Sequence, residues 1–374
     1  MPPQRSPRDL IVIGAFALLL VLPAALALLG RAGADTEFIT TVENRRPFVA
    51  PPVTSGALAT GGWERDAERQ IADAFPLRKH LIEAYDYVKY AWLGDGAGNR
   101  VLRGRDGWFY LGDEELTYLT DAYAVDAVVA HLADVYAARS AWCAQHGMHY
   151  AFVLAANKST IYPQYLPAGL AIGPPAADRL VAALRARGVR TIDTRPPLIA
   201  AARGGTLLYS KGDTHWNAEG AAIAARAIAA NLGVRDRVAA GAIRYVDRPD
   251  RGDLLNFAGI GSFVSNDVRF AEFSRTARDV PMPSYGGDPA AARYSAHASA
   301  IDDPALPSAV IFGDSFLEGL EPFLAEDFRR AVFLHHISVE DVQFDRAILG
   351  AERPQIVLQE LVERSIVFGA SFTP

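Results

Sequence analysis

The sequence contains a single cysteine, Cys143, among its 374 residues. One thiol cannot form an internal disulfide, and it cannot supply the cysteine ligands of a structural zinc site. Stability must therefore come from a hydrophobic core. Half of the residues are hydrophobic, so a chain of this length can bury one.

The chain also lacks an excess of positive charge. The chain has 37 basic against 43 acidic residues, and its formal net charge is −6. No run of lysine and arginine is interleaved with aromatic residues, as it would be in a protein that grips a phosphate backbone. The composition therefore argues against nucleic-acid binding, and we predict no nucleic-acid partner.

The longest apolar run lies near the N-terminus. Residues 10–30 carry no charge, and at about 1.5 Å per residue a helix of this length crosses the roughly 30 Å hydrocarbon core of a bilayer. Arg5 and Arg8 favour a cytoplasmic tail at residues 1–9. We therefore predict a single-pass inner-membrane anchor with the rest of the chain in the periplasm. A cleaved signal peptide ending at Ala34 is the alternative, and it would export the same domain.

The remainder divides into a linker and a folded domain. Residues 31–62 are rich in Pro, Thr, Gly and Ala, and they predict a mostly irregular stalk. The folded domain is predicted at residues 63–374, with a helix interrupted at Pro76 and a hairpin turning at Asp106 and Gly107. Residues 241–300 are rich in Gly, Pro, Asp and Ser and predict a loop-rich insertion.

Short apolar runs alternate with helical patterns along the domain. Runs of Val, Ile and Leu that lack polar alternation indicate strands buried on both faces, hence a mainly parallel sheet in an α/β sandwich. Such a sheet places its functional site at the carboxyl ends of the strands. The predicted strands begin at His149, Val189, Ser308, Arg330 and Gln355, and the predicted helices span 125–145, 174–187, 217–231 and 339–349.

The run SAVIFGDSFLEG places Ser315 at a turn between a predicted strand and the next helix. A serine hydroxyl becomes a nucleophile when a base removes its proton and N–H groups stabilise the oxyanion formed on attack. Gly313 permits a tight turn, and the Ser315 backbone N–H is a candidate oxyanion donor. The alternative is that Asp314 or Ser315 only caps the helix. The motif differs from the α/β-hydrolase elbow, because Leu317 stands where that elbow requires glycine.

A candidate base and its orienting carboxylate stand earlier in the chain, in KGDTHWNAEG. Asp213 can reach Nδ1 of His215, which leaves Nε2 to accept the proton of Ser315. Both motifs follow a strand-like run, so we expect them at the same edge of the sheet. Helix capping is one alternative. A metal site that adds His335 or His336 is another, but no helical histidine pair or cysteine cluster accompanies it, and we predict no metal.

With these motifs the sequence resembles the alginate O-acetyltransferase family of the AlgJ and AlgX type, within the SGNH hydrolase superfamily. GDSF at 313–316 and DTHW at 213–216 carry the resemblance, and similar segments extend over nearly the whole chain after the anchor. These segments are ENRRPF at 43–48, FPLRKHLIEAYDYVKY at 75–90, GRDGWFYL at 104–111, NKSTIYPQYLP at 157–167, RGDLLNFAGIG at 251–261 and RPQIVLQELVERS at 353–365.

The resemblance implies a flavodoxin-like SGNH hydrolase fold whose strands run in a circularly permuted order. It implies that Ser315 is the nucleophile, His215 the base and Asp213 the orienting acid. A triad depends on geometry and not on chain order, so the permutation leaves the chemistry intact. The strand ends HHISVED and QELVER lack the glycine and asparagine of the usual oxyanion hole, so we expect the Ser315 N–H to act with other donors.

Four further residues are candidates for contact with a sugar or an oxyanion. Lys158, Thr160 and Tyr162 lie on the loop after the first predicted strand of the sheet, although Lys158 equally suits a solvated charge. Trp216 is the fourth, and packing against the following helix is the favoured interpretation for it.

The function that the resemblance implies is an exported O-acetyltransferase that acts on hydroxyls of a secreted, alginate-like polysaccharide through an acetyl-Ser315 intermediate. A multi-pass membrane O-acyltransferase would supply the acetyl group, and we expect no cofactor. An acetyl esterase with the same triad is one alternative, because only the acceptor differs. A non-catalytic polysaccharide-binding scaffold is the other. The short sequence after residue 365 leaves no room for the carbohydrate-binding domain of the AlgX type, so we expect the AlgJ type.

Overall fold

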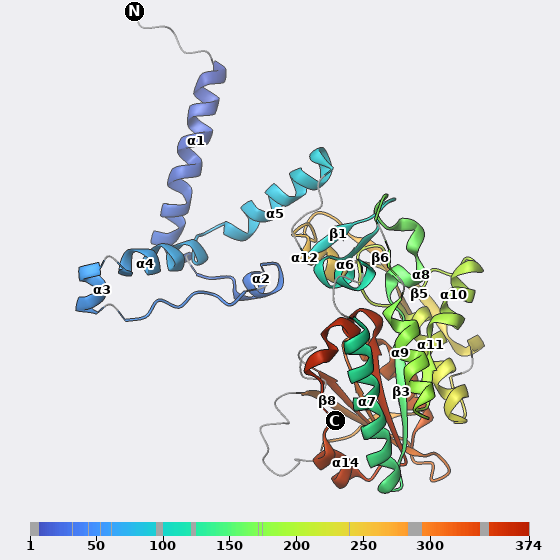
Figure 1. Ribbon diagram of the computed structural model, residues 1–374. Helices are drawn as coiled ribbons and strands as arrows, with labels where there is room; N and C mark the ends of the chain where they lie inside the picture. Colours follow the sequence, from blue (N-terminus) through green and yellow to red (C-terminus); the bar gives the residue numbers. More distant parts are fainter. Residues whose placement is uncertain are drawn as a thin grey trace, which may run out of the picture. The chain divides into compact units, whose positions relative to one another are not determined.

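The computed structural model describes residues 7–373 except residues 32, 44, 53, 61, 95–99, 121–124, 171, 174, 239, 283–293 and 337–343. The chain divides into two compact units (Figure 1). The first comprises Met1–Gly98 with Leu255–Val264, and the second comprises Asn99–Leu254 with Ser265–Pro374.

The first unit begins with the apolar helix α1 (Pro7–Leu26), which continues into the π-helical turn η1 (Ala27–Arg31). Among the described residues, the stretch Pro7–Gly30 is long and apolar enough to cross a membrane, with a mean hydropathy of 2.8. By length and composition it is a candidate for an anchor or for a signal sequence. The predicted cytoplasmic tail lies mostly in residues 1–6, outside the described residues.

Short helices follow in the first unit. The predicted stalk contains two of them, and the predicted interruption at Pro76 falls between the next two. The side chain of Asp35 caps the first by accepting the N–H of Phe38 at 3.0 Å. The second unit begins at Asn99, later than the predicted start of the folded domain at residue 63. The helices are α2 (Thr36–Thr41), α3 (Ser55–Thr60), α4 (Gly62–Asp73), α5 (Arg78–Val88) and η2 (Lys89–Leu93).

The second unit is built on a seven-stranded sheet with the order β4-β3-β11-β9-β10-β8-β7. The first five strands in this order are parallel, and β8 and β7 form an antiparallel edge. The predicted mainly parallel sheet is therefore confirmed, with a strand at each of the five predicted runs. The strands are β3 (His149–Ala155), β4 (Thr191–Asp193), β7 (Arg278–Asp279), β8 (Tyr294–Ala300), β9 (Ser308–Gly313), β10 (Arg330–His336) and β11 (Ile356–Val362).

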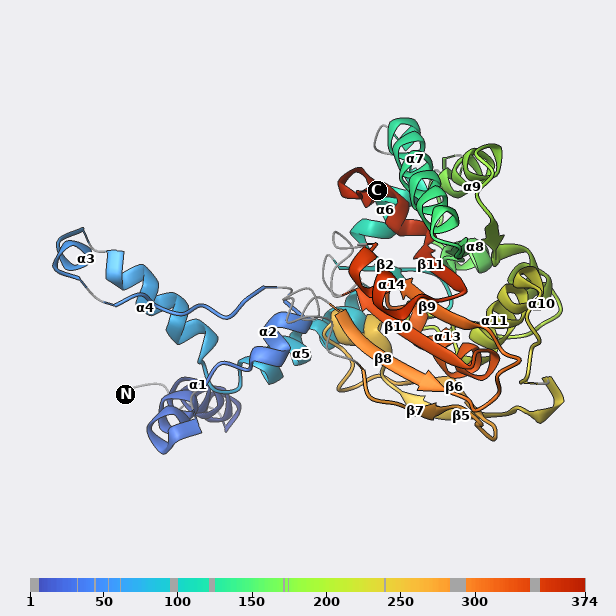
Figure 2. The ribbon, with the colours of Figure 1, turned by 90° about the horizontal axis from the view of Figure 1, so that it is seen from below.

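The core of this unit lies along its central strands. Every residue of β9 and β11 is buried, as expected for strands covered on both faces. Val310 pairs with Val332 of β10 on one side and with Val357 of β11 on the other. Figure 2 shows α7 and α9 on one side of the strands, with α11 and α13 on the other. The carboxyl ends of these central strands therefore provide fixed positions for the residues of a site.

Three of the four predicted helices are present to within a few residues, as α7, α9 and α11. The exception is the pattern at 339–349, of which residues 339–343 lie outside the described residues. α12 crosses the division between the two units. The helices are α6 (Asp113–Thr120), α7 (Val125–Gln145), α8 (Lys158–Ile161), η3 (Pro163–Tyr165), α9 (Ala176–Ala186), α10 (Arg195–Arg203), α11 (Ala218–Leu232), η4 (Ala240–Ala242), α12 (Gly252–Phe257), α13 (Leu317–Leu324), η6 (Ala325–Asp327), α14 (Arg346–Glu352) and η8 (Glu363–Ser371).

Two antiparallel ribbons complete the second unit. β1 (Val101–Arg103) and β2 (Phe109–Leu111) form the predicted hairpin, and both turn residues have positive φ, 56° at Asp106 and 76° at Gly107. The second ribbon joins β5 (Arg244–Asp250) to β6 (Asn266–Glu272) within the predicted insertion. Because β7 and β8 also come from residues 241–300, this segment contributes the antiparallel edge of the main sheet as well as loops.

Candidate functional site

Ser315 lies in the turn between the carboxyl end of β9 and the start of α13. Asp314 fixes this turn: its Oδ1 accepts the N–H of Phe316 at 2.9 Å, and its Oδ2 accepts the N–H of Val362 at 2.9 Å. Asp314 is buried, whereas Ser315 is exposed. The Asp314 side chain therefore stabilises the turn before α13, whose N-cap residue Phe316 has no side-chain cap bond, and the hydroxyl of Ser315 remains available to another partner.

The buried carboxyl group of Glu360 also stabilises the turn that carries Ser315. Oε2 of Glu360 on β11 accepts the N–H of Asp314 at 3.1 Å. Burial raises the pKa of Glu360 well above its usual range, and the neighbouring charge of Asp314 raises it further. A Cβ at Gly313 would lie 2.7 Å from Glu360 Oε2 and 2.9 Å from Leu317 Cβ, so glycine is required for this close approach.

His215 and Asp213 lie on the segment that leads into α11. Asn217 caps this helix, since its Oδ1 accepts the N–H groups of Glu219 and Gly220, both at 3.0 Å. The preceding run is not a strand of the sheet: residues 206–208 are irregular, and a single bridge joins Tyr209 to Trp216. The expectation that this motif follows a sheet strand is therefore wrong, because tight turns at 211–212 and the bridge to Trp216 replace the ladder.

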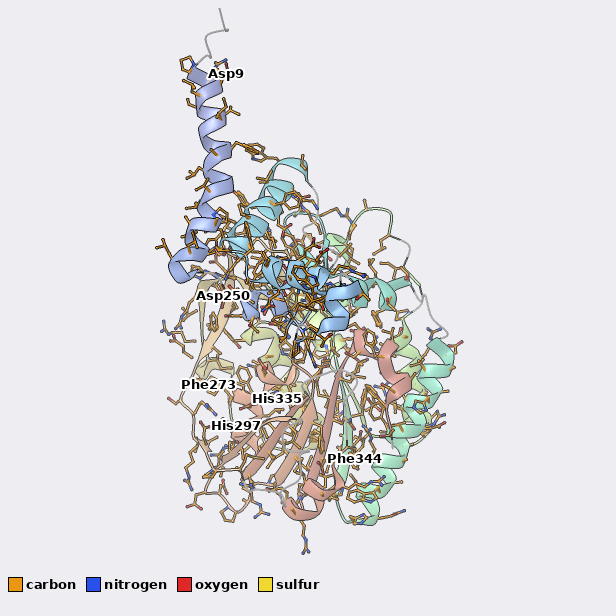
Figure 3. The ribbon with its side chains drawn as sticks, turned by 90° about the vertical axis from the view of Figure 1, so that its left-hand side faces the viewer. Asp9, Asp250, Phe273, His297, His335 and Phe344 are labelled. Carbon is orange, nitrogen blue, oxygen red and sulfur yellow. The ribbon has the colours of Figure 1, made fainter. Side chains whose placement is uncertain are left out.

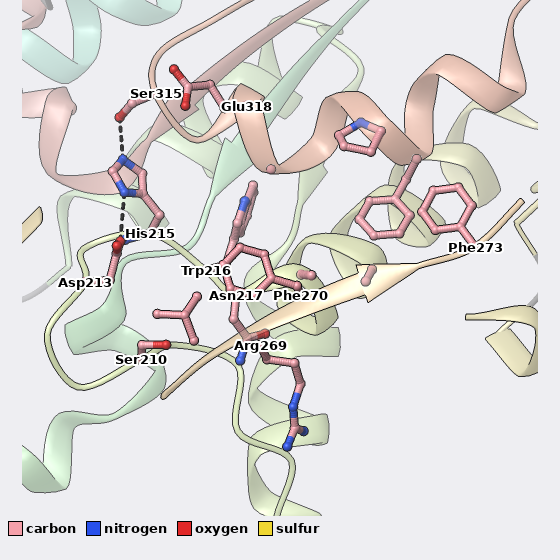
Figure 4. Close-up of a pocket in the computed structure, with 16 residues that line it drawn as sticks. Ser210, Asp213, His215, Trp216, Asn217, Arg269, Phe270, Phe273, Ser315 and Glu318 are labelled. Atoms are coloured by element: carbon pink, nitrogen blue, oxygen red, sulfur yellow. Dashed lines mark hydrogen bonds and ion pairs between the residues drawn. The ribbon is translucent and has the colours of Figure 1, made fainter. Parts of the chain in front are cut away.

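The three side chains nevertheless form one hydrogen-bonded row (Figure 4). His215 Nε2 lies 2.8 Å from Ser315 Oγ, and His215 Nδ1 lies 2.9 Å from Asp213 Oδ1. Oδ1 of Asp213 also accepts the backbone N–H of His215 at 2.8 Å. The side chains of His215 and Asp213 are 30% and 23% exposed, so the row can be reached from solvent. This arrangement suits proton removal from Ser315 by the imidazole.

The electrostatics of the row favour an ionised carboxylate beside the imidazole. Burial opposes the charge on His215, but the hydrogen bond to Asp213 and the carboxylates of Asp213 and Asp253 outweigh it and raise the pKa of His215 above 6.5. Burial likewise opposes the charge on Asp213, but its bonds to His215 outweigh burial and lower the pKa of Asp213. The carboxylate can therefore orient the ring and stabilise the imidazolium that forms during proton transfer.

Asp253 is a second carboxylate at this site, and the sequence reasoning missed it as a site residue. Its Oδ1 accepts the N–H of Thr214 at 2.7 Å, its Oδ2 accepts the Thr214 hydroxyl, and Oδ2 lies 3.8 Å from His215 Nδ1. Burial and the charge of Asp213 raise the pKa of Asp253. Its only signal in the sequence was its position in the RGDLLNF segment.

The described residues contain one group whose side chains could hold a metal ion: Asp213, His215 and Asp253, with their potential ligand atoms within 4.8 Å of one another. Both ring nitrogens of His215 are already hydrogen-bonded, so a metal at Nδ1 would displace Asp213 from the ring. His335 lies on β10 (Figure 3). Its Nε2 is 2.9 Å from Glu321 Oε2, and the side chain of His336 lies outside the described residues. The geometry therefore favours the hydrogen-bonded row over a metal site with His335.

The predicted loop after β3 is wrong in part, because Lys158 and Thr160 lie on the short helix α8 and Tyr162 follows it. The polar groups of these residues point into the protein. The buried Nζ of Lys158 donates to backbone carbonyls, the hydroxyl of Thr160 donates to Glu363 Oε2 at 3.0 Å, and the hydroxyl of Tyr162 donates to the Thr206 carbonyl at 3.1 Å. None of these three lines the cleft beside Ser315. Their polar groups are engaged within the protein, and a direct role in substrate binding stays a prediction.

Trp216 links the two halves of the site, which are the turn that carries Ser315 and the loop that carries Asp213 and His215. Its indole Nε1 donates to the carbonyl of Phe316 at 3.2 Å, and the two rings meet edge to face with centroids 5.0 Å apart. The side chain is buried, although one part of it borders the cleft. This geometry agrees with packing against neighbouring helices as the main role of Trp216.

A cleft of about 380 Å³ opens beside the row (Figure 4). Phe270 on β6, Phe273 just after it and Phe323 on α13 line the cleft, and Phe273 and Phe323 stack with ring centroids 5.3 Å apart. Arg269 also lines the cleft, but its guanidinium is paired with Glu219 and Asp247. The cleft therefore offers an apolar, aromatic surface next to the Ser315 hydroxyl.

Comparison with known proteins identifies relatives of this chain. The family described as "SGNH hydrolase-like domain, acetyltransferase AlgX" matches residues 101–348. The protein named "Probable alginate O-acetylase AlgJ" from Pseudomonas fluorescens is 25% identical over 270 residues, 68% of this chain and 61% of that protein. Its namesake from Pseudomonas putida is 27% identical over 243 residues, 62% of this chain and 61% of that protein. The chain thus spans about three fifths of these relatives.

Solved structures have a related fold. PatB1 of Bacillus cereus superposes with a TM-score of 0.52 and 14% identity, over 71% of this chain and 96% of that one. The O-acetyltransferase domain of Pseudomonas putida AlgJ gives a TM-score of 0.49 and 20% identity, over 71% of this chain and 91% of that one. Because the family matches more than half of the chain, and the sheet has the mainly parallel order expected of it, this chain belongs to the family described as "SGNH hydrolase-like domain, acetyltransferase AlgX", as the resemblance to AlgJ and AlgX predicted.

Proposed function

We propose that this protein is an exported O-acetyltransferase that transfers acetyl groups to hydroxyls of an alginate-like polysaccharide through an acetyl-Ser315 intermediate. The observation that carries the proposal is the row in which His215 Nε2 lies 2.8 Å from Ser315 Oγ and His215 Nδ1 lies 2.9 Å from Asp213 Oδ1. The names of the curated relatives support acetyl transfer as the reaction.

In the first half of the reaction His215 takes the proton of Ser315, and Oγ attacks the carbonyl carbon of the donor ester. The negative charge that develops on the carbonyl oxygen is stabilised by the Ser315 N–H, at the turn before α13, with further donors. His215 then returns its proton to the leaving oxygen of the donor. The acetyl group is left as an ester on Ser315, while Asp213 holds the ring throughout.

The second half repeats these steps with the acceptor. His215 takes the proton of a sugar hydroxyl, whose oxygen attacks the acetyl carbonyl, and the bond to Ser315 Oγ breaks as the proton returns to it. The apolar wall of the cleft, which includes Phe270 and Phe273, suits the face of a sugar ring. If water takes the place of the sugar, the same steps give an acetyl esterase, which is the second candidate.

The placement of the protein follows from the apolar N-terminal segment. We propose that residues 10–30 anchor it in the inner membrane, with residues 1–9 in the cytoplasm, residues 31–62 as the stalk, and the remainder in the periplasm. A multi-pass membrane O-acyltransferase is the proposed source of the acetyl group. The acetyl donor would then be delivered at the membrane to which the enzyme is tethered.

The experiment incubates the detergent-solubilised full chain with a chromogenic acetyl ester, with and without alginate oligosaccharides. We expect acetylated oligosaccharide by mass spectrometry and acetyl-Ser315 in the protein when the acceptor is omitted. Hydrolysis without transfer would select the esterase. Unchanged turnover in Ser315→Ala would overturn the mechanism, and so would unchanged turnover in His215→Ala.

A further inference from the structure

The loop that presents Asp213 and His215, residues 210–215, has little regular secondary structure of its own. Its backbone groups are instead bound by side chains and N–H groups from distant parts of the second unit. The Lys211 carbonyl accepts the N–H of Phe109 at 3.0 Å, the Gly212 carbonyl accepts the N–H of Leu254 at 3.1 Å, and the Gly212 N–H donates to Asn266. The position of the loop therefore depends on these partners.

Lys158 binds the carbonyl side of this loop. Its Nζ donates to the carbonyl oxygens of Ser210 at 2.7 Å, Lys211 at 2.8 Å and Asp213 at 2.9 Å. An ammonium group has three N–H donors, so these bonds use all of them. The side chain is 2% exposed, and Nζ lies 5.1 Å from the ring centroid of Trp108. A buried cation with every donor engaged holds three carbonyls in one arrangement.

Asp253 binds a backbone N–H group of the same loop. It accepts the backbone N–H and the hydroxyl of Thr214, the residue between the two members of the candidate triad. The loop is thus bound by two side chains of opposite charge: Lys158 binds three of its carbonyl groups, and Asp253 binds the N–H and hydroxyl of Thr214. The segment between them cannot shift without breaking charge-assisted hydrogen bonds.

We propose that Lys158 and Asp253 form a clamp whose function is to hold Asp213 and His215 in register with Ser315. They are positioning residues, and this inference rests on the proposed function of the site. Lys158 does not line the cleft, and its donors are all used, so it has none left for a substrate. The clamp acts on the rate of the step at Ser315 and leaves the cleft that binds the acceptor unchanged.

The charge of Lys158 gives the clamp a dependence on pH. Burial lowers the pKa of Lys158 to about 7, against the opposing effect of the carboxylates of Asp213, Asp253 and Glu115. A neutral amine has two N–H donors and cannot satisfy three carbonyls. The advantage of the wild-type protein over a variant without the amine should therefore be largest below pH 7 and shrink above it.

The test measures covalent labelling of Ser315 by phenylmethanesulfonyl fluoride in the solubilised full chain, followed by intact mass. His215 takes the hydroxyl proton, the Oγ–S bond forms and fluoride leaves, so the readout needs neither acetyl donor nor acceptor. Lys158→Met should label about 10- to 100-fold more slowly, because a displacement of about 1 Å can cost a factor of this size. Asp253→Asn, which keeps one carbonyl acceptor for Thr214, should show a smaller loss.

Lys211→Met is the matched control. Its exposed ammonium donates to the Asp106 carbonyl at 2.8 Å, so the change removes a similar bond from the same loop outside the clamp. It should label within about twofold of wild type, as expected for an exposed substitution. In Lys158→Ala, added propylammonium replaces the missing atoms and should restore labelling, which tests the amine separately from folding.

The outcomes separate the two proposals. No labelling of the wild-type protein would contradict the proposed function. If the wild-type protein is labelled, and folded Lys158→Met and Asp253→Asn are both labelled at the wild-type rate, the clamp is overturned. If Lys158→Met does not fold, rescue of Lys158→Ala by propylammonium at low pH supports the clamp, and labelling of Lys158→Ala at the wild-type rate without propylammonium overturns it.

Discussion

The turn that carries Ser315 continues directly from β9, a central strand hydrogen-bonded on both sides. The loop that carries Asp213 and His215 depends instead on the side chains of Lys158, Asp253 and Asn266 and on backbone N–H groups from distant segments. The two regions meet through a hydrogen bond of 2.8 Å between His215 and Ser315. The sheet fixes Ser315, and buried polar groups fix His215. The loop should therefore be the more sensitive half to changes in charge, and the turn the more sensitive to changes in volume.

The largest effect is expected from Asp213→Asn. The amide cannot hold the required tautomer of His215, so kcat with the chromogenic ester should fall by about 10⁴-fold without loss of the fold. The matched change beneath the Ser315 turn is Glu360→Gln, which replaces a buried carboxyl, whose pKa is raised well above its usual range by burial, with an uncharged group of similar shape. It should alter kcat by only a few fold. Equal losses in the two variants would contradict the contrast between the halves.

The next effect is expected from Gly252→Ala. Gly252 has φ of +69°, and a Cβ there would lie 2.2 Å from the carbonyl oxygen of Gly212 in the loop. The added methyl group should lower the free energy of unfolding by about 2 kcal/mol and also slow turnover. Gly233→Ala is the control, since Gly233 has φ of +73° with no atom within 4 Å. Thermal melts should show a loss in both variants, and turnover should fall only in the first.

The acidic limb of the pH dependence of kcat/KM reports on His215 in the loop. A base must be unprotonated, so kcat/KM should fall as the pH falls through the pKa of His215, with a midpoint above 6.5. The carboxylate of Asp253 contributes to this raised pKa, and Asp253→Asn should move the midpoint to lower pH. A midpoint that stays unchanged in this variant would show that Asp253 has no electrostatic effect on the ring.

The smallest effect is expected from Trp216→Phe, which removes one bond between the halves. The indole bond to the Phe316 carbonyl is buried and 3.2 Å long, and its loss should cost about 1 kcal/mol of unfolding free energy. Chemical denaturation of the full chain measures this change. A loss of several kcal/mol would mean that the two halves are coupled more strongly than this single contact indicates.

The sheet and the three residues of the row could be predicted from sequence for different reasons. Continuous apolar runs identify strands buried on both faces, and the strand-to-helix turn at Ser315 follows from them. Asp213 and His215 were found because two residues of the right chemistry stand close together in the chain. We expected them near Ser315 because a sheet strand was predicted before Asp213. The residues do lie together, but that strand is not present, so the prediction was correct for the wrong reason.

The remaining features depend on contacts between distant segments. Lys158 looked like a surface or substrate-binding charge, because its three carbonyl partners lie more than 50 residues away. Asp253 is one of many aspartates in a loop-rich segment, and nothing nearby in the sequence indicates that it meets Thr214.

The lone cysteine has a practical consequence for all of these measurements. Cys143 is fully buried, and burial raises its pKa to about 12, which keeps it as an unreactive thiol at neutral pH. A cysteine introduced on the surface would then be the single site that reacts with a maleimide probe. The native chain is thus already a suitable background for attaching one spectroscopic label at a chosen position, with no need to remove a thiol first.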